Sequence, residues 1–225
     1  MSRGQAVPSD RAREQLRVVL ELLAAERASV SSVVDERAWQ VHVTDSLTGL
    51  EVPELRSAVR IADVGAGAGF PGLALAAALP EARVDLVESV GRKCDFMRRA
   101  AAAAGIANAS VVNARSEELA LSAGRESYEV VTARAVGRLS TLAELAAPLL
   151  KDKGVLVAWK GRRDAEEERQ MESASAFLAM APEQILDVGD RAGSAHRHLH
   201  VIRKTGPTPP GLPRRPGMAK KRPRG

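Results

Sequence analysis

The 225-residue chain has one cysteine, few aromatic residues and no long hydrophobic run, and each shortage excludes a class of protein. Cys94 alone cannot form an intramolecular disulfide or supply a cysteine cluster for zinc. Apolar runs such as 73–79 stay far below the ~18 residues that a membrane span needs. The first residues lack the hydrophobic region of a signal peptide. We therefore expect a cytoplasmic protein with one α/β domain and extensions.

Acidic residues are missing from 205–225, a segment with six basic residues and six of the 12 prolines. The whole chain carries a net charge of +5, and the remainder without this segment is close to neutral. Because proline removes backbone donors and fixes φ, the composition predicts an irregular basic arm with no further helix or strand. We expect attraction to a polyanion to come mainly from this arm and to weaken with salt.

Hydrophobic periodicity divides the rest of the chain into two parts. Residues 1–50 are predicted to form a helical extension on the core, with an amphipathic helix over 10–26 and a second helix over 35–50. In 51–204, short β-rich runs alternate with helical runs, which is typical of βα units. The expected strands are 59–64, 83–87, 110–113, 128–133 and 154–159; the expected helices are a stretch with Pro71 in its first turn, 93–104, 141–150 and 164–180.

Two late strands, 185–188 and 198–204, lie close together in the sequence without a long helix between them. Such a pair is predicted to be antiparallel at one edge of the sheet. The pattern therefore indicates an α/β fold with a mainly parallel seven-stranded sheet, helices on both faces and an antiparallel edge strand.

The strongest local motif is Asp63-Val64-Gly65-Ala66-Gly67-Ala68-Gly69-Phe70-Pro71-Gly72, between a predicted strand and a predicted helix. Glycines in such a turn allow the φ values of a sharp bend and a close approach of backbone to ligand. The spacing is G-x-G-x-G, and Phe70 stands where a dinucleotide-binding loop would have its third glycine. This departure weakens the prediction of a nicotinamide-dependent oxidoreductase, which stays an alternative.

Two carboxylates flank this loop in the predicted fold. Asp63 would repel a pyrophosphate, but it suits a ligand with an ammonium and a sulfonium, both of which S-adenosylmethionine has. Glu88 ends the second strand, where it can accept hydrogen bonds from both ribose hydroxyls of either NAD or S-adenosylmethionine. The pair favours S-adenosylmethionine without excluding a nicotinamide cofactor.

Further short motifs run through nearly the whole chain. They are His42-Val43-Thr44-Asp45-Ser46-Leu47, the glycine loop, Glu88-Ser89 with Arg92-Lys93 and Phe96, Arg115-Ser116-Glu117-Glu118, Arg134-Ala135-Val136, Lys160-Gly161 and Leu212-Pro213-Arg214-Arg215-Pro216-Gly217. In order and spacing the chain resembles the bacterial ribosomal RNA small-subunit methyltransferase G family, also called glucose-inhibited division protein B. The resemblance implies a Rossmann-like class I methyltransferase fold and methylation of N7 of a guanine in 16S ribosomal RNA.

Carried over by position, the resemblance implies that Gly65 and Phe70 contact the cofactor, Ser116 and Glu117 border the adenine, and Arg134 completes the pocket. Together with the loop argument, the expected cofactor-binding residues are Asp63, Gly65, Gly67, Phe70, Glu88, Ser116, Glu117 and Arg134, with Arg134 also positioning the reactants. One departure is Val30-Ser31-Ser32-Val33, where many relatives carry Asn-Leu-Thr.

The residues present agree with a guanine N7 target. N7 already presents a lone pair, so no base is needed to remove a proton. After the fourth strand the chain reads Thr132-Ala133-Arg134-Ala135, without the Asn/Asp-Pro-Pro-aromatic motif of enzymes that methylate exocyclic amines. Cys94 lies within a predicted helix away from strand ends, which favours a core thiol over the nucleophile of cytosine C5 chemistry.

Basic residues follow several predicted strands at the edge where ligands bind in open α/β sheets. The expected RNA-binding residues are Arg138, Lys160, Arg162, Arg163, Arg214, Arg215, Lys220 and Lys221. With only six aromatic residues, recognition should depend on RNA shape and phosphates. We expect a monomer acting on the small subunit or an assembly intermediate, and a non-catalytic RNA-binding assembly factor stays an alternative.

The histidines are open to two interpretations each. His196, His198 and His200 alternate along a predicted strand and would share one face, which favours a polar face over a metal site because no cysteine or carboxylate completes a ligand set. His42 fits either a turn contact with Asp45 and Ser46 or a place at the mouth of the cofactor pocket. No metal is expected.

Overall fold

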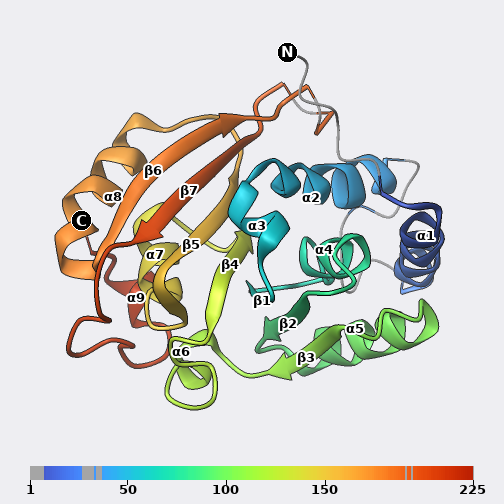
Figure 1. Ribbon diagram of the computed structural model, residues 1–225, viewed down its shortest axis with the longest axis horizontal. Coiled ribbons are helices and arrows are strands. Elements are labelled where there is room, and N and C mark those ends of the chain that lie inside the picture. Colours follow the sequence, from blue (N-terminus) through green and yellow to red (C-terminus); the bar gives the residue numbers. More distant parts are fainter. Residues whose placement is uncertain (1–7, 27–32, 34–36, 191, 194, 225) are drawn as a thin grey trace.

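A seven-stranded sheet forms the centre of this computed structural model, which describes residues 8–26, 33, 37–190, 192–193 and 195–224. The strand order is β3-β2-β1-β4-β5-β7-β6 (Figure 1). The strands are β1 (Arg60–Val64), β2 (Arg83–Glu88), β3 (Ala109–Asn113), β4 (Tyr128–Arg134), β5 (Leu150–Lys160), β6 (Met180–Asp187) and β7 (His198–Lys204). The five strands β1 to β5 are parallel to one another, and β7 is antiparallel to both β5 and β6. This arrangement confirms the predicted sheet.

One face of the sheet is covered by α4 (Gly72–Ala78) and α5 (Gly91–Ala103), and α1 (Asp10–Ala25) packs on the outer side of these two helices (Figure 1). The side chains of α1 that face inward join the same hydrophobic cluster as strands β1 and β2. The helix predicted over 35–50 begins in residues outside those described. Its described part consists of three consecutive helical turns: a π-helical turn (Trp39–Thr44), α2 (Asp45–Leu47) and a 3₁₀ turn (Thr48–Glu51), followed by α3 (Pro53–Ser57).

The opposite face is covered by α7 (Leu139–Ala146) and α8 (Ala165–Leu178), with the short helices α6 (Ser116–Leu119) and α9 (Met218–Lys221) beside α7. Helices on both faces were predicted, and the two groups lie on opposite sides of the sheet in Figure 1. The short helices were not predicted, because four residues are too few for a periodic pattern. Helix α7 ends before Pro148, so β5 begins earlier than expected.

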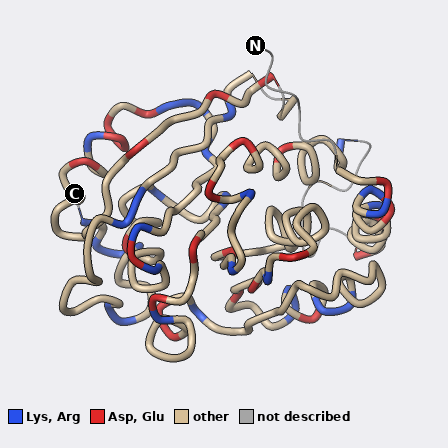
Figure 2. Tube along the Cα trace, viewed as in Figure 1, with Lys and Arg blue, Asp and Glu red and all other residues tan. Residues whose placement is uncertain are grey.

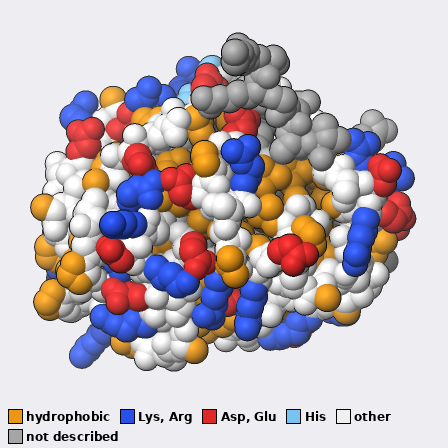
Figure 3. Space-filling view, in the orientation of Figure 1, with side chains coloured by type: hydrophobic (Ala, Val, Ile, Leu, Met, Phe, Trp, Pro, Cys, Tyr) orange, Lys and Arg blue, Asp and Glu red, His pale blue; other side chains and the backbone are white. Residues whose placement is uncertain are grey.

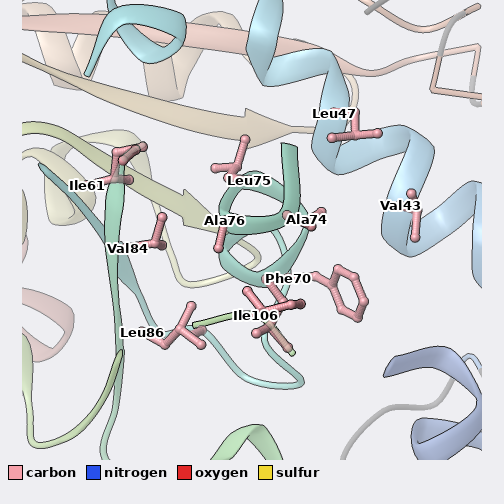
Figure 4. Close-up of a cluster of buried hydrophobic side chains, with 14 of the residues drawn as sticks. Val43, Leu47, Ile61, Phe70, Ala74, Leu75, Ala76, Val84, Leu86 and Ile106 are labelled. Atoms are coloured by element: carbon pink, nitrogen blue, oxygen red, sulfur yellow. The ribbon is translucent and has the colours of Figure 1, made fainter. Parts of the chain in front are cut away.

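Phe70 anchors the glycine loop in the core on the α4 face. Its side chain is 4% exposed and lies between α4 and the segment that carries Val43 and Leu47 (Figure 4). Burial of a phenylalanine side chain stabilises a fold by roughly 1.5 to 3 kcal/mol. The loop is therefore tied to the core by its own aromatic side chain.

The prediction of irregular backbone holds for most of the C-terminal segment, but the expectation that it contains no further helix is wrong. Residues 205–224, here called the C-terminal strap, fold back along the α7 face: Leu212 is buried and the strap contains α9. Arg214 donates from Nε and Nη2 to the two carboxylate oxygens of Glu144, at 2.5 Å each. Composition alone did not show the buried partner carboxylate on α7.

Basic and acidic residues are interspersed along the trace and over the face shown in Figures 2 and 3.

Candidate active site

The glycine loop follows β1 at the carboxyl ends of the parallel strands. Gly65, Gly67 and Gly69 all have positive φ, at 69°, 59° and 92°. Such values cost little only for glycine. A Cβ at Gly65 would also lie 2.6 Å from Cγ2 of Val136, in the turn after β4. The sequence therefore holds the loop in one compact shape close to that turn.

Asp63 lies beneath this loop and not in a ligand cleft, which corrects its expected role as a ligand contact. The side chain is fully buried; Oδ1 accepts a hydrogen bond from Oγ1 of Thr132 at 2.9 Å, and Oδ2 accepts one from the backbone N of Gly72 at 2.9 Å. Burial raises the pKa of this carboxyl to about 6, although both hydrogen bonds act against the shift. Asp63 thus connects β1, β4 and the start of α4.

A first hollow of about 420 Å³, here called the glycine-loop hollow, opens beside Gly65. Glu88 lines it from the end of β2 and is 8% exposed. Its Oε2 accepts from the backbone N of Gly67 at 3.1 Å, and its Oε1 accepts from the N of Val90 at 2.9 Å. Each carboxylate oxygen can accept a further hydrogen bond, so Glu88 is held in place and still able to bind hydroxyl groups.

Ser116 and Glu117, which belong to α6 after β3, also line this hollow. Ser116 Oγ donates to Oε2 of Glu117 at 3.2 Å, and Oε1 of Glu117 accepts from the backbone N of Gly217 at 2.8 Å. The strap thereby contributes to the same wall. Of the predicted cofactor residues, the structure brings Gly65, Glu88, Ser116 and Glu117 together around one hollow, and the backbone N of Gly67 meets the Glu88 carboxylate there.

A second hollow of about 450 Å³, the Arg134 hollow, lies on the other side of the turn 135–137. Arg134 Nη1 donates to Oδ2 of Asp45 at 2.8 Å and to the carbonyl of Val41 at 3.0 Å. Arg197 pairs with Oδ1 of the same carboxylate at 2.7 Å, and Trp159 Nε1 donates to the carbonyl of Asp45 at 2.9 Å. Arg134 therefore does not line the glycine-loop hollow as expected, but the adjoining one.

Sequence reasoning missed the importance of Asp45 and Arg197. Asp45 was noted as part of a short motif and as a turn contact, yet it is 1% exposed and forms ion pairs with two guanidinium groups. Its three partners lie roughly 90 to 150 positions further along the chain. The available signal was that Asp45 is the only Asp, Glu, Lys or Arg between Ala38 and Leu50.

His42 stacks on Phe70, with ring centroids 5.0 Å apart and an interplanar angle of 20°. Its Nε2 lies 2.9 Å from the carbonyl oxygen of Val33, and Ser46 Oγ donates to the carbonyl of His42. Burial lowers the pKa of the imidazole, which favours the neutral form at pH 7. His42 therefore makes the turn contact that was considered, and it lines the Arg134 hollow and not the glycine-loop hollow. The departure at 30–33 lies outside the described residues apart from Val33.

Most of the predicted RNA-binding residues have partners within the protein. Lys160 donates to Oε1 of Glu167 at 2.6 Å, and Arg138 donates to Oε1 of Gln170 at 2.6 Å. Arg162 contacts His196, and Arg163 binds Glu168 through two hydrogen bonds. Arg214 forms an ion pair with the buried Glu144, which occupies its guanidinium within the protein. Arg215, Lys220 and Lys221 are exposed.

The remaining candidates are structural. Cys94 is buried, its Sγ lies 3.2 Å from the carbonyl of Glu88, and burial raises its pKa, which confirms a core thiol. His196 precedes β7, so the three histidines do not share one strand as predicted. Among the described residues, no three His, Cys, Asp or Glu side chains form a group that could hold a metal. No helix in the described part is long and apolar enough to cross a membrane.

The sheet order, the glycine loop after β1 and the acidic residue at the end of β2 define a Rossmann-like class I methyltransferase fold. Among solved structures, an S-adenosylmethionine-dependent methyltransferase from Aquifex aeolicus is similar, with a TM-score of 0.57 and 15% identity, covering 76% of this chain and 94% of that one. At this identity the likeness concerns the fold.

The model of the GidB family, described as rRNA small subunit methyltransferase G, matches residues 16–199. A ribosomal RNA small subunit methyltransferase G of Rubrobacter xylanophilus is 40% identical over 220 residues, covering 94% of this chain and 84% of the relative. A protein of the same name from Pelotomaculum thermopropionicum is 39% identical over 197 residues, covering 87% and 82%. The chain therefore belongs to the rRNA small subunit methyltransferase G family.

Proposed function

We propose that this enzyme transfers a methyl group from S-adenosylmethionine to N7 of a guanine in 16S ribosomal RNA. Family membership supports the reaction, and nothing in the comparisons favours the oxidoreductase or the non-catalytic factor. The observation that carries the proposal is the glycine-loop hollow, where a loop with three positive-φ glycines meets two carboxylates from β2 and α6.

The residues around that hollow fit the cofactor. Gly65 and Gly67 let the backbone approach closely, Glu88 offers acceptors for ribose hydroxyls, and Ser116 and Glu117 border the space for an adenine. S-adenosylmethionine supplies an electrophilic methyl group when bound. Asp63 and Phe70 lie beneath the glycine loop. Asp63 fixes the start of α4, and Phe70 fixes the end of the loop.

The Arg134 hollow is the proposed side of entry for the guanine. A guanine presents two acceptors on one edge, N7 and O6, and N7 needs no deprotonation before it is methylated. Arg134 and Arg197 are donors fixed by Asp45 beside the turn 135–137, which separates the two hollows. Arg134 is therefore proposed as a positioning residue. The neutral His42 is not required as a base.

The wider setting is also part of the proposal. We infer that the substrate is the small ribosomal subunit or an assembly intermediate in the cytoplasm, and that the chain acts as a monomer. The division into an extension (1–50), a methyltransferase domain (51–204) and a C-terminal segment (205–225) stays a prediction. The shared hydrophobic cluster of α1 with the sheet supports treating the first two as one folding unit.

The test is methyl transfer from labelled S-adenosylmethionine to small subunits that lack the modification, followed by mapping of the labelled base. We expect label at one guanine N7 and a large loss with Arg134→Ala. Label on protein or on an exocyclic amine would contradict the proposed chemistry. Absence of label with normal cofactor binding would favour the assembly factor.

A further inference from the structure

The C-terminal strap reaches the cofactor site from the far end of the chain. Gly217, Ala219, Lys220 and Lys221 line the glycine-loop hollow together with the residues of β2 and α6. Ala219 is 3% exposed, and its carbonyl accepts a hydrogen bond from Oγ1 of Thr141 at 3.3 Å. The backbone of this part of the strap is thus fixed to α7.

Two further contacts hold the strap in this position. Its Gly217 N donates to Glu117 at 2.8 Å, so a residue of the proposed adenine side is also bound by the strap. Arg214 binds the buried Glu144 through two hydrogen bonds and also donates to the carbonyl of Arg222 at 2.8 Å. Removing one partner of a buried, hydrogen-bonded ion pair is strongly destabilising, so this attachment is firm.

The charges at the mouth of the hollow do not match a cationic ligand. Inside it lie the carboxylates of Glu88 and Glu117, whereas the exposed cations Arg115, Lys220 and Lys221 line its rim. S-adenosylmethionine carries a net positive charge, so rim cations do not increase its attraction. Unlike Arg214, both lysines are solvent-exposed side chains on a backbone that is held in place. Fixed cations of this kind suit the phosphates of a nucleic acid.

We propose that residues 214–221 form the outer wall of the cofactor site, and that Lys220 and Lys221 bind the ribosomal RNA backbone across the mouth of that site. This inference rests on the proposed function and adds to it a fixed RNA contact beside the nucleoside. The strap is then not a loose arm that attracts RNA from a distance. It brings the two substrates to the same edge of the sheet.

The test compares K220A/K221A with a matched double variant, K151A/K153A, whose two lysines lie at the amino end of β5, opposite the site. Binding of small ribosomal subunits is measured over a range of salt concentrations. In K220A/K221A we expect affinity about tenfold lower and a slope of log affinity against log salt reduced by about 1.5. Affinity for S-adenosylhomocysteine should stay within twofold of the wild type. Wild-type RNA affinity in K220A/K221A, or an equal loss in K151A/K153A, would overturn the inference.

A deletion of 216–225 tests the wall itself while keeping Leu212 and Arg214. We expect S-adenosylhomocysteine to bind about tenfold more weakly, with little change in the midpoint of thermal unfolding. Unchanged affinity would show that the strap is not part of the cofactor site. If the wild type binds small subunits but transfers no methyl group, the proposed function fails. If the wild type methylates and K220A/K221A behaves like it, only this inference fails.

Discussion

The glycine-loop hollow and the Arg134 hollow share the turn 135–137 but are built from different kinds of contact. In the first, most contacts are made by backbone groups of neighbouring loops, and the inner side chains are carboxylates. In the second, the buried Asp45 holds two arginines that come from β4 and from the residue before β7. The first therefore suits a cationic nucleoside, and the second suits a ligand with acceptor atoms.

The largest expected effect on cofactor affinity comes from a substitution in the glycine loop, which belongs to the first hollow. Gly67→Val forces a β-branched residue into φ of 59°, although a Cβ there would meet no atom closer than 3.8 Å. We expect binding of S-adenosylhomocysteine to fall at least ~1000-fold, because each factor of ten corresponds to about 1.4 kcal/mol and the loop must change shape. Isothermal titration measures this loss.

Gly105→Val is the matched control. Gly105 also has positive φ, at 64°, and has open space around its Cβ position, but it lies at the end of α5 away from both hollows. Both variants should lose about 1 to 2 kcal/mol of unfolding free energy. Equal cofactor affinity in the two variants would mean that the loop does not hold the cofactor.

The second prediction concerns the other hollow. Asp45→Ala leaves Arg134 and Arg197 without their shared carboxylate, with side chains only 13% and 24% exposed. We expect a loss of about 3 kcal/mol in unfolding free energy and a large loss of methyl transfer, with cofactor affinity changed less than threefold. Denaturant unfolding and calorimetry provide the two measurements. The exposed pair Arg98–Asp95 gives the control: Asp95→Ala should cost below about 1 kcal/mol.

The third prediction is that the unfolding free energy depends on pH through Asp63, which lies beneath the glycine loop. Burial raises the folded-state pKa of Asp63 from 3.8 to about 6. The folded protein therefore binds this proton more tightly than the unfolded chain does. Its contribution to stability is complete below pH 3.8 and is lost as pH rises through about 6. The change amounts to roughly 2 to 3 kcal/mol, since one pKa unit corresponds to about 1.4 kcal/mol.

Asp63→Asn should remove that slope between pH 4 and 6, as measured by denaturant unfolding at each pH. Glu126 contributes in the opposite direction, because hydrogen bonds from Lys204 and Thr208 lower its pKa to about 2. That contribution is lost as pH falls toward 2, so the difference between wild type and Asp63→Asn isolates Asp63. Parallel curves for the two proteins would show that Asp63 is not held in a desolvated site.

The smallest expected effect is at Glu88. Glu88→Gln keeps an acceptor but loses the charge, so S-adenosylhomocysteine should bind about tenfold more weakly, or about 1.4 kcal/mol. Glu118→Gln serves as the comparison, since Glu118 caps α6 through the backbone N of Arg115 and is not among the residues that line the hollow. A similar loss in both variants would assign the effect to local charge and not to ribose binding.

The elements that position the site were predictable because their signals are local. Alternating strands and helices, and the glycines after β1, follow from short-range sequence patterns, and all appear in the structure within a few residues. Asp63 was misplaced for a physical reason. Helices cover both faces of the sheet, so apolar residues occur on both sides and the pattern does not tell which way a side chain at a strand end points.

The second hollow and the strap were not predictable in the same way. The pair Arg134–Asp45 joins residues 89 positions apart, and Arg214–Glu144 joins residues 70 apart. Prolines and basic residues in the strap were interpreted from composition, which does not show that Glu144 is buried and faces the strap. Such long-range ion pairs are visible only once the fold has brought the partners together.

A crystal structure of the protein with S-adenosylhomocysteine would show directly whether the glycine-loop hollow is the cofactor site. We expect the nucleoside in that hollow, its ribose hydroxyls within hydrogen-bond distance of Glu88, its adenine beside Ser116 and its sulfur toward the turn 135–137. The nucleoside in any other cavity, or this hollow vacant at saturating ligand, would contradict this expectation.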